Sequence, residues 1–466
     1  MITSIIMINT SGEATHNKPH HNRGFATRTR FARPCAGRYR SNGVRYFMAK
    51  LTAVLMALLL SSCGYAQDNA IRWQEDIDVY AEKLIEGHID PFHTLPQKVF
   101  DDEIVRIRES VPYKTENEIL IELMRLTRKI NDGHTSFPLW GHEYDSFPLE
   151  LKLFDNDLYV LSTTSQHKYL LASKLVSING VSSLDVVRLL SEISPFSENE
   201  FSTAIRAAGY FTNAAVLSGL GIVENEDEAK FVFDVQGEKR EINLEFSRSP
   251  KLDARISHLN DAIFSADEKV DSNLWYGSSS DNKTVYVKFR RYTSISKMEK
   301  FSRSLLGFID KNKSENLIID LRDNYGGDFF VGLKLAQQLV LADTINWRSG
   351  VYTLIDNVTF SAAMSNAAQF SQILNSKLVG SPTGARPSGY QDMGQFALPN
   401  SGLEVTFSKR LYSFKDTQRD ALYPDVHIET SIEDYRDAYD RQLRWVLSDI
   451  QDRGGADNKA LQRTSR

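Results

Sequence analysis

Residues 317–321, with the sequence Leu-Ile-Ile-Asp-Leu, constrain the fold of this chain more than any other segment. A run of large aliphatic residues of this length suits a strand that is covered on both faces, as in a parallel sheet. Strand-like and helix-like segments alternate around it, which is typical of a layered α/β domain. The alternating segments are residues 285–289, 317–321, 331–340, 351–355, 362–374 and 377–380. We therefore predict an α/β fold for residues 271–448.

Two smaller regions are expected ahead of this domain. Residues 63–136 place apolar side chains at helical spacing, starting at Trp73, and are predicted to be helical. Residues 137–270 contain short runs with a period of two, such as 149–153, and are predicted to form a β-rich module. The polar residues 449–466 are predicted to form a disordered tail.

The first 62 residues are expected to lie outside the fold. Residues 1–47 are rich in Arg, His, Asn and Thr and show no apolar periodicity, which indicates an unstructured leader or a mis-assigned start. Residues 48–62 have the parts of a signal peptide, with Lys50 ahead of the apolar run 51–60. This run would span about 15 Å as a helix, which is too short to cross a bilayer.

The segment Leu-Ser-Ser-Cys that ends at Cys63 resembles the lipobox of bacterial lipoproteins. That resemblance implies lipidation of Cys63, which would become the mature N-terminus. Gly64 after the cysteine implies the outer membrane. We therefore expect a lipid-anchored protein of the bacterial cell envelope that faces the periplasm or the cell exterior. An ordinary signal peptide, cleaved after Ala66, is the alternative.

Charge and cysteine content exclude several kinds of partner. The first 62 residues carry nine Lys and Arg and one acidic residue, whereas the remainder carries 46 basic and 59 acidic residues. An acidic body argues against nucleic acid as a partner. The two cysteines, Cys35 and Cys63, cannot build a disulfide framework or a thiolate metal site.

Three short segments contain residues suited to chemistry. In Asp-Leu-Arg-Asp-Asn-Tyr-Gly-Gly, a strand runs into Gly326 and Gly327, whose backbone can adopt positive φ and point N–H groups at an oxyanion. By itself, such a glycine pair is more often a tight turn. Arg322 of this segment is expected to form a structural ion pair with Asp320 or Asp323.

The other two segments contribute a serine and a histidine. Ser361 stands at the start of a predicted helix and precedes the small Ala362; this helix end favours developing negative charge, although a serine there is more often an N-cap. His134 follows the turn Asn-Asp-Gly, and a lone histidine is more often structural than catalytic. No spacing typical of metal ligands surrounds His134, so we expect neither a metal nor a cofactor.

In combination, these segments resemble the C-terminal processing (tail-specific) serine peptidase family, and above all its branch with tricorn protease and the interphotoreceptor retinoid-binding protein. The resemblance covers residues 73–447. Its motifs are, in order, Asp-Gly-His-Thr, Lys-Leu-Val-Ser-Ile-Asn-Gly, Asp-Leu-Arg-x-Asn-x-Gly-Gly, Thr-Phe-Ser-Ala-Ala, Pro-Thr-Gly and Tyr-Pro-Asp.

The resemblance implies a role for each matched residue. Ser361 matches the nucleophile and His134 the general base. The backbone N–H groups of Gly326 or Gly327 and of Ala362 match the oxyanion hole. The α/β domain would have the ClpP/crotonase-like fold, and the β-rich module would be a reduced PDZ-like domain.

The chain departs from the family pattern at three places. Arg386 stands where the Ser/Lys branch has its lysine, and an arginine cannot act as the base near neutral pH. An acid is expected shortly before Tyr-Pro-Asp, where Gln418 is flanked by Asp416 and Asp420; we assign Asp420 as the acid that orients the base. Gly133 replaces the serine that precedes the base in tricorn.

These observations predict an exported serine endopeptidase that hydrolyses peptide bonds in protein or peptide substrates. A serine hydroxyl attacks only after a base takes its proton, and a histidine has the pKa for that task. The alternative is a catalytically inactive, peptidase-like protein of the cell envelope that binds peptides or small hydrophobic ligands. A crotonase-type acyl-CoA enzyme would share only the fold.

Overall fold

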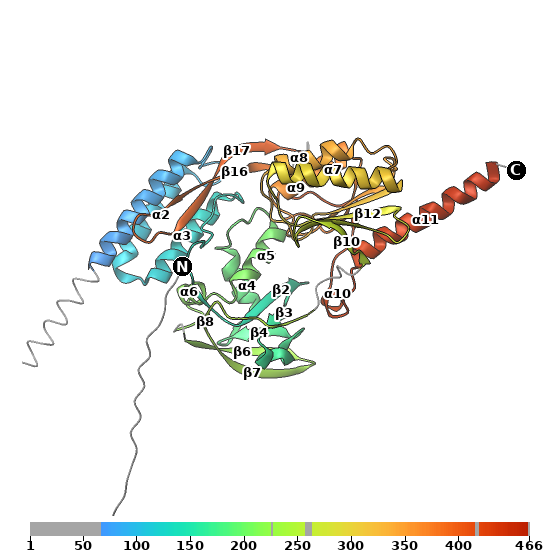
Figure 1. Cartoon of the computed structure of the whole chain (residues 1–466). Coiled ribbons are helices and arrows are strands. Elements are labelled where there is room, and N and C mark those ends of the chain that lie inside the picture. Colours follow the sequence, from blue (N-terminus) through green and yellow to red (C-terminus); the bar gives the residue numbers. More distant parts are fainter. Residues whose placement is uncertain (1–66, 225–226, 257–262, 415–418, 465–466) are drawn as a thin grey trace, which may run out of the picture. The chain divides into compact units, whose positions relative to one another are not determined.

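The computed structural model of the chain describes residues 67–224, 227–256, 263–414 and 419–464 (Figure 1). The expected leader (1–47), the signal segment (48–62) and the lipidation residue Cys63 lie outside the described residues. Among the helices that are described, none is both long and apolar enough to span a membrane.

The first described elements are helices, as predicted. Residues 67–87 form one helix, followed by α2 (Gln97–Ser110), the short 3₁₀ helix η1 (Val111–Tyr113) and α3 (Glu116–Ile130). Thr115 and Glu118 form a capping box at the start of α3, and Asn131 ends it with a left-handed backbone (φ 67°). The end of α3 therefore lies directly before the turn that carries His134.

A seven-stranded antiparallel sheet follows. Five of its strands lie in the spatial order β2-β3-β4-β6-β7, while β5 pairs with β4 and β9 with β3. Exposed and covered residues alternate along β6, which agrees with the predicted β-rich module. The strands are β1 (Asp145–Ser146), β2 (Leu149–Phe154), β3 (Asp157–Thr163), β4 (Lys174–Ile178), β5 (Val181–Ser182), β6 (Glu228–Val235), β7 (Glu238–Glu245), β8 (Ser247–Arg248) and β9 (Ala254–Arg255). The helices of this region are η2 (Ser165–Leu170), α4 (Ser183–Ser191), α5 (Glu200–Tyr210) and α6 (Ala214–Gly219).

The third region is a seven-stranded sheet in the order β10-β11-β12-β13-β14-β15-β18, parallel from β12 onward. Its strands are β10 (Ala266–Lys269), β11 (Leu274–Ser278), β12 (Thr284–Phe289), β13 (Asn316–Asp320), β14 (Val351–Ile355), β15 (Lys377–Gly380) and β18 (Val426–His427). Its helices are α7 (Ile295–Asn312), α8 (Phe329–Leu339), α9 (Ala362–Ile373), α10 (Ile432–Arg436) and α11 (Arg441–Thr464). The predicted α/β fold is therefore confirmed.

The central strand β13 is covered on both faces, as its sequence predicts. Leu317 and Ile319 pack into one core with residues of α7, α8 and α9. Ile318 packs into a second core on the opposite face, together with Leu443 and Val446 of α11. Successive side chains of a strand point to opposite faces, so only an uninterrupted apolar run can fill both cores.

The sequence predicts a disordered tail from residue 449, whereas the structure has helix α11 there. The structure continues this helix to Thr464. Asp449 accepts a hydrogen bond from the hydroxyl of Tyr352 in β14 (2.5 Å), and Arg453 donates to Ser349. Apolar side chains of α11 as far as Ile450 pack against the sheet. Asp449 and Arg453 add polar contacts in the part of the helix where the sequence shows no apolar pattern.

A long hairpin, β16 (Ser388–Ala397) and β17 (Glu404–Ser413), extends from the α/β region to the N-terminal helices. Its turn is held by the buried carboxylate of Asp76, which accepts the backbone N–H groups of Asn400 and Ser401 (2.8 Å each). Along β17, Thr406 and Ser136 exchange backbone hydrogen bonds (2.9 and 3.2 Å). The hairpin thus fixes the segment that carries His134.

Candidate active site

Ser361 occupies a sharp turn between β14 and α9. Its backbone has φ 49° and ψ −125°, a combination that side-chain-bearing residues rarely adopt. Its side chain makes no N-cap hydrogen bond. The plain capping role is therefore excluded, and the strained strand-to-helix turn has the geometry that exposes a nucleophile.

His134 lies directly against this serine. Its Nε2 is 2.9 Å from Ser361 Oγ, although 227 positions separate the two residues in the chain. The imidazole stacks on Phe360, with ring centres 5.4 Å apart, and only 5% of the residue is exposed. The two residues that sequence reasoning selected separately thus come together at hydrogen-bonding distance.

Asp132 fixes the turn that holds His134. Its Oδ1 accepts the His134 backbone N–H (3.0 Å) and the Ser408 hydroxyl (2.5 Å), and its Oδ2 lies 2.8 Å from His88 Nε2. Burial acts to raise the pKa of Asp132, but the hydrogen bonds from His88 and Ser408 outweigh burial and lower it. His88 Nδ1 accepts the Asp90 N–H, so Nε2 carries the proton that His88 donates to Asp132.

Glu198 is the carboxylate next to the base. Its Oε1 lies 3.6 Å from His134 Nδ1, and neither atom has a hydrogen-bond partner among the described residues. Its Oε2 accepts the backbone N–H of Arg386 (2.7 Å), and the residue is 3% exposed. Glu198 precedes α5, whose N-cap Asn199 donates to the carbonyl groups of Thr383 and Asp420 (3.0 and 2.8 Å).

The structure does not bring Asp420 to His134, which corrects our assignment of the orienting acid. Asp420 is exposed, and its carboxylate accepts the hydroxyl of Tyr423 (3.0 Å). Its main-chain carbonyl, rather than its side chain, serves the site by holding Asn199. No signal in the sequence marked Glu198, because a glutamate before an N-cap residue is an ordinary feature of helix starts.

Gly133 makes room for this arrangement. A Cβ atom at this position would lie 2.4 Å from Glu198 Cγ and 2.7 Å from Phe360 Cζ. Both contacts are far shorter than van der Waals distance, so a serine at this position would displace the acid and the ring under the base. Gly133 is thus matched to the carboxylate of Glu198, which lies just before α5.

The turn at Gly326 and Gly327 lies beside the serine. Gly326 has φ 97°, and a Cβ on it would come within 2.9 Å of the Ala362 nitrogen. The N–H of Gly326 is donated to the Asn324 side chain (2.9 Å). The N–H groups of Gly327 and Ala362 have no acceptor among the described residues. Of the predicted donors, these two are therefore available to an oxyanion.

The serine and histidine open into a cleft of about 870 Å³. Much of its wall is aromatic, and Tyr325 and Phe330 are about half exposed. Neither Lys377, which pairs with Asp449 at 3.4 Å, nor Arg386 lines this cleft. Within the described parts of the chain, no group of three or more His, Cys, Asp and Glu residues could hold a metal ion.

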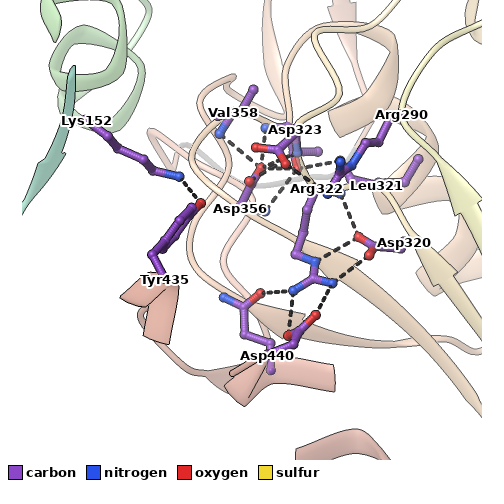
Figure 2. Close-up of polar contacts among 12 residues, drawn as sticks. Lys152, Arg290, Asp320, Leu321, Arg322, Asp323, Asp356, Val358, Tyr435 and Asp440 are labelled. Carbon is purple, nitrogen blue, oxygen red and sulfur yellow. Dashed lines mark hydrogen bonds and ion pairs between the residues drawn. The ribbon is translucent and has the colours of Figure 1, made fainter. Parts of the chain in front are cut away.

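Figure 2 shows a network of charged side chains next to the two turns. Arg322 bonds the carboxylates of Asp320 (2.6 and 2.9 Å) and Asp440 (2.8 Å each). Its predicted ion pair with Asp320 is therefore confirmed, whereas Asp323 pairs with Arg290 (3.1 Å). Burial opposes ionisation of Asp320, yet the positive charges of Arg322 and Arg290 lower its pKa to about 2.

Asp356 joins the serine turn to the glycine turn. Its carboxylate accepts the backbone N–H groups of Val358 and Thr359 on one side and of Asp323 on the other, at 2.9–3.2 Å (Figure 2). Burial and the charge of Asp323 raise the pKa of Asp356 from 3.8 to about 6, against the opposing charge of Lys152.

The raised pKa of Asp356 predicts a measurable effect of pH on stability. Between about pH 4 and 6 the folded protein holds a proton at Asp356 that the unfolded chain has released, so this group lowers the free energy of unfolding as pH rises. Relative to Asp356→Asn, the parent should lose roughly 1–3 kcal/mol between pH 4.5 and 7. Urea unfolding of both proteins at the two pH values measures this; an equal difference at both would contradict it.

Comparison with known proteins gives the fold an independent basis. No protein-family model matches this sequence, and neither does any curated protein. The solved structure of mature CPAF is 12% identical, covers 81% of this chain and 96% of its own, and superimposes with a TM-score of 0.55.

Two further similar structures have lower scores. The photosystem II D1 C-terminal processing protease is 12% identical, with 78% of this chain and 93% of its own covered and a TM-score of 0.38. Tricorn protease is 13% identical, with 82% and 36% covered and a TM-score of 0.37. Of the three, the likeness to mature CPAF shows a shared fold.

Proposed function

We propose that this protein is a serine peptidase that hydrolyses peptide bonds in protein or peptide substrates. The observation that carries the proposal is the 2.9 Å contact between His134 Nε2 and Ser361 Oγ at the strained turn. The fold shared with mature CPAF, and the motifs by which the sequence resembles a serine peptidase family, support the same conclusion. In the proposed mechanism, Ser361 is the nucleophile and His134 the general base.

The reaction begins when His134 Nε2 takes the proton of Ser361 Oγ as this oxygen attacks the substrate carbonyl. The N–H groups of Gly327 and Ala362 hold the oxyanion that forms. His134 then gives the proton to the leaving amine, which leaves an acyl group on Ser361. A water molecule, activated by the same histidine, releases the acid product and restores the serine.

Glu198 is the positioning residue of this mechanism. For Nε2 to accept a proton, Nδ1 must carry one, and Glu198 Oε1 is the acceptor that faces Nδ1. The 3.6 Å separation is longer than a hydrogen bond. We expect it to shorten when substrate fills the cleft, as catalytic hydrogen bonds often tighten in the complex.

The same long separation favours a second candidate, an inactive protein that binds peptides or small hydrophobic ligands in the aromatic cleft. The two candidates differ in whether Ser361 reacts. A binding protein would retain its ligand unchanged, whereas the peptidase would release two products.

Removal of Ser361 or His134 should abolish hydrolysis. We expect the full chain to cleave an unfolded protein such as casein, and Ser361→Ala and His134→Ala to lower the rate by roughly 10⁴–10⁶-fold. Ser296→Ala and His427→Ala, at exposed positions, serve as matched controls that keep full activity. Thermal melting shows whether all variants are folded.

Each other outcome of this assay has a defined meaning. Cleavage that survives His134→Ala would assign the base to another group. Absence of cleavage by the parent, with casein retained on the protein, would favour the binding protein.

Replacement of Glu198 should act on turnover. Glu198→Gln keeps an oxygen that can accept the Arg386 N–H, but it removes the negative charge that would stabilise a protonated His134. The value of kcat should therefore fall by about 10²–10⁴-fold, with little change in KM. Asp420→Asn is the matched control and should be neutral, because the Asp420 carboxylate is exposed and, in the described part of the chain, bonds to Tyr423 rather than to the base. Steady-state kinetics on a peptide mapped from casein measure both. Equal losses in the two variants would contradict the assignment of Glu198.

We also propose that the protein is exported and anchored by a lipid on Cys63, in the outer membrane of a bacterial cell envelope. The signal segment 48–62 and the Leu-Ser-Ser-Cys sequence support this proposal.

Lipidation predicts that the full chain, produced in a bacterial host, takes up a labelled fatty acid. Cys63→Ala should lose the label and accumulate with its signal segment uncleaved. Cys35→Ala is the matched control and should keep the label. Release of an unlabelled protein that starts after Ala66 would instead establish an ordinary signal peptide.

A further inference from the structure

Arg206 of α5 stands in the wall of the cleft beside the two turns of the active site. Its guanidinium carbon lies 4.3 Å from the ring centre of Tyr325 and 5.4 Å from that of Phe360. Tyr325 directly precedes Gly326, and Phe360 directly precedes Ser361. The positive charge is therefore close to the place where a substrate bond would be cut.

This guanidinium has no anionic partner among the described residues. It forms no ion pair there, and its buried Nε has no hydrogen-bond acceptor. Arg322, by comparison, is satisfied by two carboxylates. Cation–π contacts with the aromatic rings offset part of the cost of desolvating Arg206, yet they use none of its N–H groups. An arginine keeps its charge under all ordinary conditions, so the N–H groups stay available to an anion.

The other charges that line the cleft do not supply that anion. Asp392 pairs with Lys409 (3.3 Å) and Arg410 (3.1 Å). Asp328 accepts the backbone N–H of Phe330 (3.0 Å) at the start of α8. The described lining thus carries three cationic side chains against two carboxylates, both already engaged. A carboxylate on a bound peptide would supply the anion that Arg206 lacks.

We propose that Arg206 is a specificity residue that binds a carboxylate of the substrate, near the scissile bond, between the aromatic walls of the cleft. The planar fork of an arginine matches the two oxygens of a carboxylate. The carboxylate belongs either to the C-terminus of the substrate or to an Asp or Glu side chain. This inference rests on the proposed peptidase function, but a measurement of peptide binding tests the carboxylate site independently of cleavage.

The test uses a labelled hexapeptide of alanine, leucine and phenylalanine that carries one Asn and a C-terminal amide. A second form replaces the Asn by Asp, and a third has a free C-terminal carboxylate. Binding of each form to the full chain with Ser361→Ala is measured by fluorescence anisotropy, and cleavage of each by the parent is measured by mass spectrometry. Arg206→Gln and Arg206→Lys are added in both backgrounds, with Arg188→Gln as the control at an exposed position on α4.

We expect one or both charged peptides to bind about 10- to 100-fold more tightly than the neutral one, the range of a charge-assisted hydrogen-bonded pair. The charged form that gains affinity identifies the source of the carboxylate. Arg206→Gln should bring the ratio near one, and Arg206→Lys should retain part of it because lysine keeps the charge without the fork. Arg188→Gln should keep the ratio of the parent.

Equal binding of neutral and charged peptides, or a ratio that Arg206→Gln leaves intact, would overturn the inference. Preference in binding without cleavage by the parent would support the carboxylate site and contradict the peptidase. Cleavage of all three peptides at equal efficiency would support the peptidase and contradict the carboxylate site.

Discussion

The site depends first on hydrogen bonds between β17 and the segment that follows α3. Thr406 pairs with Ser136 along the backbone, and Ser408 donates to the buried carboxylate of Asp132. These contacts place His134 against Ser361 from a distant part of the chain. A base and a nucleophile on separate regions need such a brace, because a displacement of about 1 Å can cost two orders of magnitude in rate.

A second set of hydrogen bonds fixes the serine turn and the glycine turn of the α/β region relative to each other. Asp356 accepts N–H groups from both turns, and Asn324 links them again through its carbonyl, which accepts the Phe360 N–H (3.0 Å). The neighbouring charges of Arg322, Asp320 and Asp440 are buried but fully paired (Figure 2). Buried pairs of this kind add little net stability, but removal of one partner is costly. These pairs therefore tie Arg322, just after β13, to Asp440 at the start of α11.

Helix α5 connects the middle module to the chemistry. Its start supplies Glu198 beside the base, and Arg206 lies along its cleft side. The middle module thus contributes to the site itself. Any motion of α5 relative to the sheet would change the distance from Glu198 to His134 and the position of the Arg206 charge together.

The sequence alone determined the α/β fold, the strand β13 and the separate selection of Ser361, His134 and the glycine turn, because apolar periodicity and turn residues act over a few neighbouring positions. The acid beside the base was decided only by the tertiary structure. Glu198 reaches His134 because Gly133 leaves space and Asn199 is bonded to Thr383 and Asp420, contacts between residues far apart in the chain. The structure also continues α11 beyond residue 449, where Asp449 accepts a hydrogen bond from Tyr352 of β14. Local patterns carry no record of such long-range packing, which is where the described structure and the sequence prediction differ.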